Sequence, residues 1–255
     1  MHPLLISRVG VDAEGDQILL SMIEWGMTTA GIQRDQFHPT GQVIVNFNQG
    51  EPEYNIVEET AWDFIDIDLL PEIPGKYLLY HGSLALRSQK SKITLANLKQ
   101  QKTVECFVDA NFRPPWINTE VISDLLGETK WLKVNKQELA GFLNTKPEKF
   151  ETSFFENNPL ELVLITSGSS GAQLKTKNGF QFQTHPAPGV KVMDTVGAGD
   201  AFSSIFLLGL LKKWSLELIM QRASEFASAV VGIRGAISYD NNFYQKFIKA
   251  WGLSL

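Results

Sequence analysis

The amino-acid sequence predicts an α/β protein in three α/β/α layers: a mostly parallel β-sheet with helices on both faces, and a small β lid. The first observation is that short apolar runs alternate with helical segments, as buried parallel strands alternate with their crossover helices. The second is that a strand pair at Gln42–Val57 interrupts this alternation. The third is length, because 255 residues with 44% hydrophobic residues suit one large domain. We therefore expect a single domain over residues 1–255, with the lid at about residues 41–58.

The elements are expected in a simple order along the chain. LLISRVG (residues 4–10) is typical of a strand, and a helix follows at Asp16–Trp25. Gln42–Val57 contains two strands joined around Asn48–Glu51, where the turn residues favour a hairpin. The remaining elements are strands within 76–84, 103–111, 130–135 and 160–168, helices at Ser88–Gln100, Lys136–Leu143 and Ala201–Lys213, and a second hairpin around Lys177–Gly179.

The segment DTVGAGDAFSS, Asp194 to Ser204, places two glycines around one alanine before a helix. Glycine lets the backbone turn tightly or approach a ligand, and we expect a short extended piece at the end of HPAPGVKVM to lead into the motif. An anion site would then form from the unpaired N–H groups of Gly197, Ala198, Gly199 and Asp200. Asp200 is either an ordinary carboxylate in the first helical turn or a general base beside a phosphate cradle. A dinucleotide-binding fingerprint is rejected, because Phe202 occupies its third glycine position.

Two further segments carry polar groups at the ends of expected strands. Asn135 and Glu138 share one face of a helix start, where they form either a capping box or a set of oxygen atoms that organises Mg²⁺ and its waters. LITSGSSGAQL contains Thr166, Gly168 and Gly171. These residues form either a plain Ser/Gly turn or a loop whose backbone and hydroxyl groups contact phosphate or ribose.

Composition argues against several classes of protein. The formal net charge of −5, without a basic stripe, argues against nucleic acid as the main partner. The run IFLLGLL is too short to span a bilayer and MHPLLISRVG is a poor signal peptide, so no membrane partner and a cytoplasmic location are expected. The single cysteine, Cys106, excludes an internal disulfide and is expected to be a packed thiol. His38 and His81 lack the partner spacing of metal ligands and are expected at loop or strand-end positions.

Several motifs, in order, resemble those of the ribokinase-like sugar kinases, also called the PfkB carbohydrate kinase family. DTVGAGDAF resembles the family signature, and four other stretches agree: SRVGVDAEGDQI, HPTGQVIV, DANFRPPW (Asp109–Trp116) and LKVNKQEL, which contains an N-x-x-E motif. HPTGQVIV and DANFRPPW are most similar to fructokinases. The resemblance covers essentially the whole chain. It implies a ribokinase-like fold and an ATP-dependent kinase that transfers the γ-phosphoryl group to a hydroxyl of a fructose-like sugar.

The resemblance also implies catalytic roles. Asp200 would take the proton of the acceptor hydroxyl, while the N–H groups of Gly197, Ala198 and Gly199 hold the developing negative charge. Arg113 is expected near the acceptor or the transferred phosphate, and a structural pairing of Arg113 with Asp109 is an equal alternative.

Cofactor and metal roles follow from the same resemblance. Asn135 and Glu138 would organise Mg²⁺ through water against the ATP phosphates. The ATP-binding residues would be Asn135, Glu138, Thr166, Gly168, Gly171, Gly197 and Gly199. Asp194 either holds a monovalent cation such as K⁺, together with the carbonyls of Val196 and Gly235, or caps the turn.

One departure from the family is large. Members begin with a strand that carries a sugar-binding aspartate, a first lid strand and a glycine pair, whereas this chain starts inside what resembles the second strand. About 40 residues, comparable to one β-α-β unit, are therefore expected to be missing, through an upstream start or a natural truncation. Their loss is expected to expose strand edges and apolar surface. The HPTG and D-x-N-x-R elements leave a 2-keto-3-deoxygluconate kinase as one alternative. The missing segment motivates a second alternative, a non-catalytic ribokinase-like protein that binds nucleotide or a partner.

The Gln42–Val57 hairpin is expected to be a lid over the acceptor site. Val43, Val45 and Phe47 lie on one face of its first strand, and Ile44 and Asn46 lie on the other. A projecting strand pair cannot bury both faces within one chain. One face is therefore expected to meet the sugar, and the other to be exposed or paired with the lid of a second subunit in a homodimer. Closure would exclude water from phosphoryl transfer.

Overall fold

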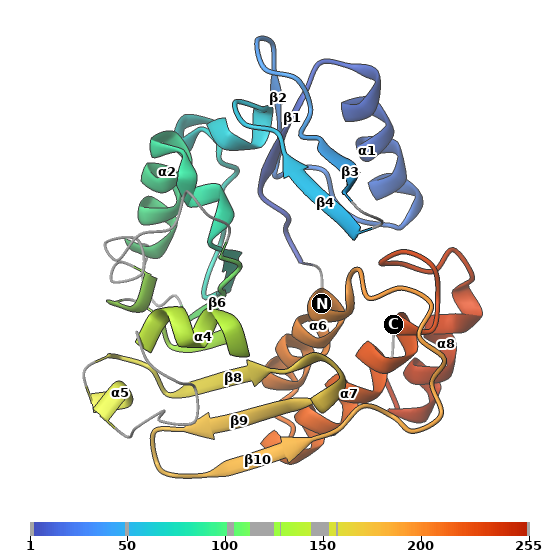
Figure 1. The fold of residues 1–255 in the computed structure, drawn as a ribbon. Helices are drawn as coiled ribbons and strands as arrows, with labels where there is room; N and C mark the ends of the chain where they lie inside the picture. Colours follow the sequence, from blue (N-terminus) through green and yellow to red (C-terminus); the bar gives the residue numbers. More distant parts are fainter. Residues whose placement is uncertain are drawn as a thin grey trace. The chain divides into compact units, whose positions relative to one another are not determined.

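The computed structural model describes residues 3–48, 51–100, 105–112, 125–127, 129–143, 153–156 and 158–253. The chain divides into two compact units, which are described in turn (Figure 1). Unit 1 comprises Met1–Cys106 and Asn111–Leu125, and unit 2 comprises Phe107–Ala110 and Leu126–Leu255. The expected single domain over residues 1–255 stays a prediction.

Unit 1 starts with a β-α-β element. β1 (Ser7–Gly10) and β2 (Ile32–Asp35) pair in parallel, and α1 (Ala13–Glu24) connects them. The expected start of α1 at Asp16 is wrong, because Asp12 caps the helix earlier: Asp12 Oδ1 accepts the N–H of Gly15 at 2.8 Å. Asp12 Oδ2 also accepts the N–H of Thr40 at 2.7 Å. One carboxylate therefore starts the helix and fixes the segment that leads to the hairpin.

A buried ionic cluster closes the end of β2. Arg8 Nε lies 2.6 Å from Asp35 Oδ2, and Asp35 Oδ1 accepts the N–H groups of Phe37 and His38 at 2.8 and 2.9 Å. Burial acts to raise the pKa of Asp35, but these N–H groups, the His38 ring and Arg8 outweigh burial and lower the pKa to about 2. His38 lies in a loop, as expected, and stacks on Phe64 with 3.7 Å between ring centroids.

The expected hairpin is present in unit 1. β3 (Val43–Asn48) and β4 (Glu51–Ile56) pair antiparallel, with Val43 opposite Ile56. Val43, Ile44 and Val45 are 54%, 47% and 44% exposed, so both faces of this part of β3 meet solvent. The side chains of Asn46 and Phe47 lie outside the described residues. The role of the hairpin as a lid stays a prediction.

Arg87 fastens the base of the hairpin to the rest of unit 1. Its guanidinium donates to both carboxylate oxygens of Asp63, at 2.7 Å each. It also donates to the carbonyls of Ile56 and Val57, at 3.3 and 2.6 Å. The other elements of unit 1 are η1 (Ala61–Phe64), η2 (Ile67–Leu69), β5 (Leu78–Gly82), η3 (Leu84–Arg87) and α2 (Gln89–Gln100).

Unit 2 is built on a β-sheet with the order β10-β9-β8-β7-β6. β6 (Glu105–Asp109), β7 (Trp131–Asn135) and β8 (Leu162–Thr166) are parallel. β9 (Ala172–Thr176) and β10 (Gln181–Thr184) continue the sheet antiparallel and form the second expected hairpin. Asn135 pairs with Thr166, so the carboxyl ends of β7 and β8 are level with each other.

Helices pack on both faces of this sheet, which confirms the predicted layers (Figure 1). α4 (Lys136–Leu143) has the expected bounds and packs against β7 and β8. α6 (Ala198–Leu211) and α7 (Leu216–Val231) pack along each other, and α7 contacts β9 and β10. The other helices of this unit are α5 (Ser153–Glu156), η5 (Gly168–Ser170) and α8 (Asn241–Ala250).

The core of unit 2 lies between the sheet and α6. Phe107 in β6 and Phe206 in α6 are fully buried, with 5.8 Å between their ring centroids. Cys106, which precedes Phe107 on β6 and belongs to unit 1, is buried and is not part of a disulfide, in agreement with its expected packing role. Within the part of the chain that the structure describes, every helix is too short or too polar to cross a membrane.

Candidate active site

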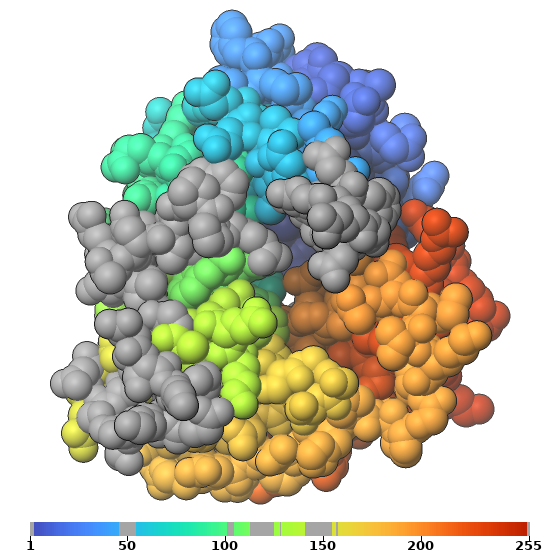
Figure 2. Space-filling view, viewed as in Figure 1, coloured from blue at the N-terminus to red at the C-terminus, as the bar shows by residue number. Residues whose placement is uncertain are grey.

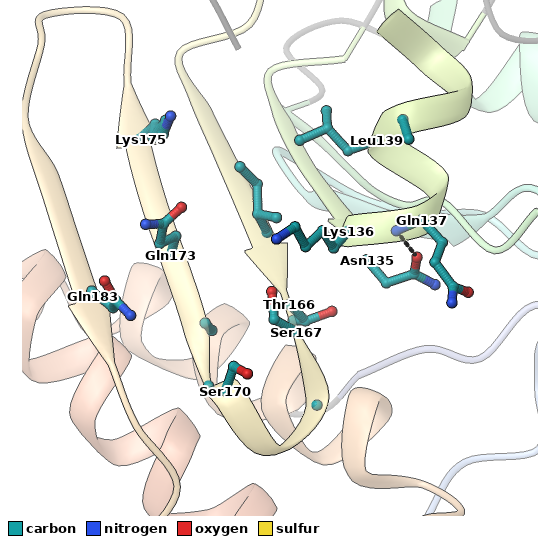
Figure 3. A pocket seen from close by; sticks show the side chains of 15 residues that line it. Asn135, Lys136, Gln137, Leu139, Thr166, Ser167, Ser170, Gln173, Lys175 and Gln183 are labelled. Atoms are coloured by element: carbon teal, nitrogen blue, oxygen red, sulfur yellow. Dashed lines mark hydrogen bonds between the residues drawn. The ribbon is translucent and has the colours of Figure 1, made fainter. Parts of the chain in front are cut away.

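A groove of about 970 Å³ opens in unit 2 at the carboxyl ends of β7 and β8 (Figure 3). Its walls come from the start of α4, the loop after β8 and the β9–β10 hairpin; Figure 2 shows the surface of these segments in yellow-green to light orange. Four residues expected to bind nucleotide line it: Asn135, Thr166, Gly168 and Gly171. Much of the remaining lining is polar and includes Lys136, Gln137, Gln173, Lys175 and Gln183. The groove therefore offers amide, hydroxyl and ammonium groups to one ligand.

Asn135 and Glu138 form the capping box that the sequence offered as their structural alternative. The N–H of Glu138 donates to Asn135 Oδ1 at 2.8 Å, and the N–H of Asn135 donates to Glu138 Oε2 at 2.7 Å. The N–H of Gln137 also donates to Asn135 Oδ1, as the dashed line in Figure 3 shows. Asn135 lines the groove, and the cap fixes its amide there before any ligand arrives.

The loop after β8 is a tight turn that depends on glycine. The N–H of Ser167 donates to the carbonyl of Gly171 at 2.8 Å, and the N–H of Gly171 donates to the carbonyl of Gly168 at 3.0 Å. Gly171 has a φ of 89°, and a Cβ there would lie 2.9 Å from the Cα of His185. No side chain fits at this position, so the loop is held close against the end of β10.

Gly197 makes the turn into α6. It is the N-cap residue with a φ of 79°, and a Cβ on it would lie 2.7 Å from the Cα of Ala236. Because of this turn α6 begins at Ala198, and the expected start at Ala201 is wrong. Residues 185–197 contain no strand, so the short extended piece expected before the motif is not part of a sheet.

The first turn of α6 retains two of the four donors of the expected anion site, those of Gly199 and Asp200. The N–H of Ala198 donates to the carbonyl of Thr195 at 3.3 Å, so its expected place among the unpaired donors is corrected. The N–H groups of Gly199 and Asp200 lie in the first turn, where an α-helix provides no acceptor. These two donors, at the positive end of the helix dipole, suit an anion.

Asp200 projects from this first turn with an exposed side chain. Nearby protein atoms that exclude water from part of the carboxyl raise its pKa, and the neighbouring carboxylate of Asp109 raises it further. The ammonium of Lys133 acts in the opposite direction. A carboxylate with increased proton affinity beside a set of N–H donors is the arrangement that a general base needs.

Sequence reasoning missed the cluster that supports Asp200. Lys133 Nζ lies 2.6 Å from Asp109 Oδ2, and the hydroxyl of Ser203 donates to the same oxygen at 2.9 Å. The available signal was a lysine inside the apolar strand WLKVN, because a buried charge requires a partner. Asp109 takes Lys133 as its partner. The alternative of a structural Arg113–Asp109 pair rests on Arg113, which lies outside the described residues.

Asp194 joins two loops beside the turn into α6. Its Oδ1 accepts the N–H of Val196 and its Oδ2 accepts the N–H of Gly235, both at 3.0 Å. These two bonds lower the pKa of Asp194. The capping role offered by the sequence is thus observed, and it places Val196 and Gly235 next to the carboxylate. The described residues contain no cluster of three His, Cys, Asp or Glu side chains that could hold a metal ion.

β7 connects the two parts of the site. Lys133 and Asn135 are two residues apart on this strand, so they lie on the same face at a spacing of about 6.6 Å. The Asp200 cluster and the groove are therefore neighbours within unit 2. His81, in contrast, is the second-last residue of β5 in unit 1, near the strand end as expected, and burial lowers its pKa to about 4.

Comparison with known proteins assigns the chain to a family. The pfkB family carbohydrate kinase domain matches residues 3–242. A sugar kinase of Pyrococcus horikoshii is 27% identical over 250 residues, which cover 92% of this chain and 76% of that protein. A 2-dehydro-3-deoxygluconokinase of Haemophilus influenzae is 24% identical over 255 residues, which cover 91% of this chain and 80% of that protein. Among solved structures, the chain is similar to a double mutant of fructokinase from Vibrio cholerae with fructose, ADP and potassium ion bound. The TM-score is 0.79 at 21% identity, and the match covers 94% of this chain and 83% of that chain. The chain thus has the ribokinase-like fold and belongs to the pfkB family of carbohydrate kinases.

Proposed function

We propose that this carbohydrate kinase uses ATP and transfers the γ-phosphoryl group to a hydroxyl of a fructose-like sugar. The observation that carries the proposal is the place of Asp200 in the glycine-capped first turn of α6. The polar groove in the same unit supports it, because its lining includes Asn135 and the Thr166–Gly171 loop.

The groove fits a nucleotide in size and chemistry. Its volume of about 970 Å³ is at the upper end of the range for small-molecule sites. Lys136 and Lys175 supply positive charge, and the Asn135 amide and Thr166 hydroxyl supply polar contacts. When bound, ATP would supply the phosphoryl group, held by these side chains and the backbone of the Thr166–Gly171 loop.

The chain's own residues then act on the acceptor. The carboxylate of Asp200 accepts the proton of the sugar hydroxyl as the hydroxyl oxygen attacks, and its raised pKa favours this transfer. The N–H groups of Gly199 and Asp200 stabilise the negative charge of the transferring group. A contact of Arg113 with the acceptor or the phosphate stays a prediction.

Two cation sites belong to the proposal. Asn135 and Glu138 would organise Mg²⁺ through water, since Mg²⁺ takes oxygen ligands and keeps several waters. Asp194, with the carbonyls of Val196 and Gly235, would hold a monovalent cation such as K⁺. The support is that the carboxylate accepts the N–H groups of both residues, which brings these two stretches of backbone beside it.

The general-base role is tested by Asp200→Asn, measured as ATP-dependent sugar phosphorylation. We expect kcat to fall about a hundredfold or more, because general-base catalysis contributes that much. Glu217→Gln is the matched control, since Glu217 occupies the first turn of the adjacent helix α7 outside the site. Turnover of Asp200→Asn within about threefold of wild type would refute the role. ATP binding by calorimetry without turnover on any sugar would favour the non-catalytic alternative.

The sugar is tested with a panel that contains fructose, 2-keto-3-deoxygluconate, ribose and adenosine. We expect the highest kcat/KM with fructose or a fructose-like sugar. The similarity to a 2-dehydro-3-deoxygluconokinase supports 2-keto-3-deoxygluconate as the second candidate. A preference for ribose or adenosine would contradict the proposal. The cytoplasmic location and the lack of a nucleic-acid partner stay predictions.

A further inference from the structure

Lys133 is a buried cation inside an apolar strand of unit 2. It is 6% exposed, and its neighbours Leu132 and Val134 are fully buried. A charge in such a place is costly unless it is paired and hydrogen-bonded. An apolar residue at position 133 would avoid this cost, so the lysine needs an explanation beyond packing.

The partners of Lys133 fix its ammonium in one place. Asp109 Oδ2, at the end of β6, lies 2.6 Å from Lys133 Nζ. The hydroxyl of Ser203 reaches the same carboxylate oxygen at 2.9 Å and the carbonyl of Gly199 at 3.0 Å. Two strands and the first turn of α6 are therefore connected through three side chains.

Gly199 shows where the ammonium points. A Cβ at this position would meet Lys133 Nζ at 3.4 Å and, apart from the two flanking residues and the helix backbone, no other described atom within 4 Å. The ammonium thus lies directly against the first turn of α6, next to the residue proposed as general base. Because glycine has no side chain, no Cβ lies between this turn of the helix and the ammonium.

We propose that Lys133 is a positioning residue for phosphoryl transfer: fixed by Asp109 and Ser203 against Gly199, it holds the first turn of α6 and supplies the positive charge that faces Asp200. This inference rests on the proposed function, because it assigns a purpose to the surroundings of the proposed base.

The charges around Asp200 explain why a cation is needed. Asp109 from β6 and Lys133 from β7 both act on Asp200, and α6 carries no other charged residue. The adjacent helix α7 carries Glu217, Arg222 and Glu225, of which Arg222 is stacked on Trp214 at 4.1 Å. Asp109 alone would favour the protonated form of Asp200, which cannot accept the proton of a hydroxyl. Lys133 opposes this effect while it keeps Asp109 in place.

The test uses two substitutions that each remove one charge and should move the acid limb of the kcat–pH profile in opposite directions. In Lys133→Met the cation is lost, so the acid limb of the kcat–pH profile moves to higher pH. In Asp109→Asn the repelling carboxylate is lost, so the acid limb moves to lower pH. A charge this close commonly changes a carboxyl pKa by about one unit or more, so the midpoint of the acid limb should move up by about one pH unit in Lys133→Met.

Two further variants serve as controls. Lys133→Arg keeps the cation and should keep the wild-type acid limb even if kcat falls. Lys133→Met combined with Asp109→Asn leaves no buried unpaired charge, so it should fold even if Lys133→Met does not, and its acid limb should lie between those of the single variants. A purely structural role would lower kcat in all variants and leave the acid limb in place.

A direct titration separates this inference from the proposed function. The side-chain carboxyl carbon of Asp200 is followed by NMR in ligand-free protein, and the pKa of Asp200 should rise in Lys133→Met and fall in Asp109→Asn. If both variants leave this pKa unchanged or move it in one direction, the inference is wrong, whatever the activity. If the pKa moves as expected but Asp200→Asn stays active, the base assignment fails and the electrostatic coupling stands.

Discussion

Gly197 occupies a position that excludes every other residue for two separate reasons. Its φ of 79° disfavours any side chain, and Ala236 fills the space where a Cβ would lie. Gly197→Ala should therefore lower the free energy of unfolding by about 3 kcal/mol, from backbone strain and overpacking together. Because the turn sets the direction of the α6 N–H groups, kcat should fall as well.

Gly179 provides the matched control for this substitution. It has a φ of 85° in the β9–β10 turn, but a Cβ there would meet nothing within 4 Å. Gly179→Ala should cost about 1 kcal/mol, the strain alone, and leave kcat unchanged. Urea unfolding and turnover are measured for both variants. Equal losses of stability would show that the contact with Ala236 is unimportant.

Asp35 makes the stability of unit 1 depend on pH. Its pKa is about 2 in the folded chain against 3.8 for the free side chain, so the folded state favours the carboxylate. The corresponding stabilisation, about 2 kcal/mol, is complete above pH 3.8 and is lost as the pH falls to about 2. Urea unfolding between pH 7 and pH 2 should show this loss in wild type.

In Asp35→Asn the stabilisation by the carboxylate should already be missing at pH 7. Asp16→Asn is the control, because its carboxylate is 66% exposed and pairs with Arg34 at the surface. That variant should change stability by less than about 1 kcal/mol. A wild-type pH dependence in Asp35→Asn would contradict the assignment.

For the element α4, a substitution of Glu138 separates two roles of this residue: capping the helix and organising a metal ion. Glu138→Gln keeps an oxygen that can accept the N–H of Asn135, and glutamine serves in capping boxes. Stability should therefore change by less than about 0.5 kcal/mol. If Glu138 also organises Mg²⁺, kcat should fall and the Mg²⁺ concentration for half-maximal activity should rise. Unchanged Mg²⁺ dependence would leave the cap as the role of Glu138.

The β3–β4 hairpin is the second element with a testable role. Val45→Lys places a charge on an exposed apolar strand, so it should raise the KM for sugar or dissociate a homodimer. Ile93→Lys is the control, since Ile93 is 52% exposed on α2. Phe47→Lys repeats the test on the same expected face. Light scattering and sugar kinetics are the measurements; wild-type mass and turnover in both hairpin variants would exclude the lid and the interface.

Local patterns predicted most elements well. Both hairpins and the bounds of α4 are as expected, because turn residues and apolar periodicity are local signals. The starts of α1 and α6 were each placed three residues late. In both cases the cap decided the start: Asp12 binds Gly15 in one helix, and Gly197 makes a left-handed turn in the other.

At the scale of the whole molecule, the ordered motifs were enough to predict the α/β/α layers and the family, which the domain match over residues 3–242 confirms. The resemblance also assigned Asn135 and Thr166 to one ATP site, and both residues line the groove. It could not pair Lys133 with Asp109, which are 24 residues apart on neighbouring strands. That pairing depends on register and on the approach of α6, which no local pattern encodes.

The carboxylate of Asp194 has a consequence for local unfolding in unit 2. It accepts N–H groups from positions 196 and 235, so one side chain closes a loop that contains all of α6 and α7. In hydrogen-exchange terms, the amides of Val196 and Gly235 should be exposed together and form one cooperative unit. Protonation of Asp194 at low pH weakens both bonds at once, so their exchange should accelerate in parallel as the helix pair is released at both ends.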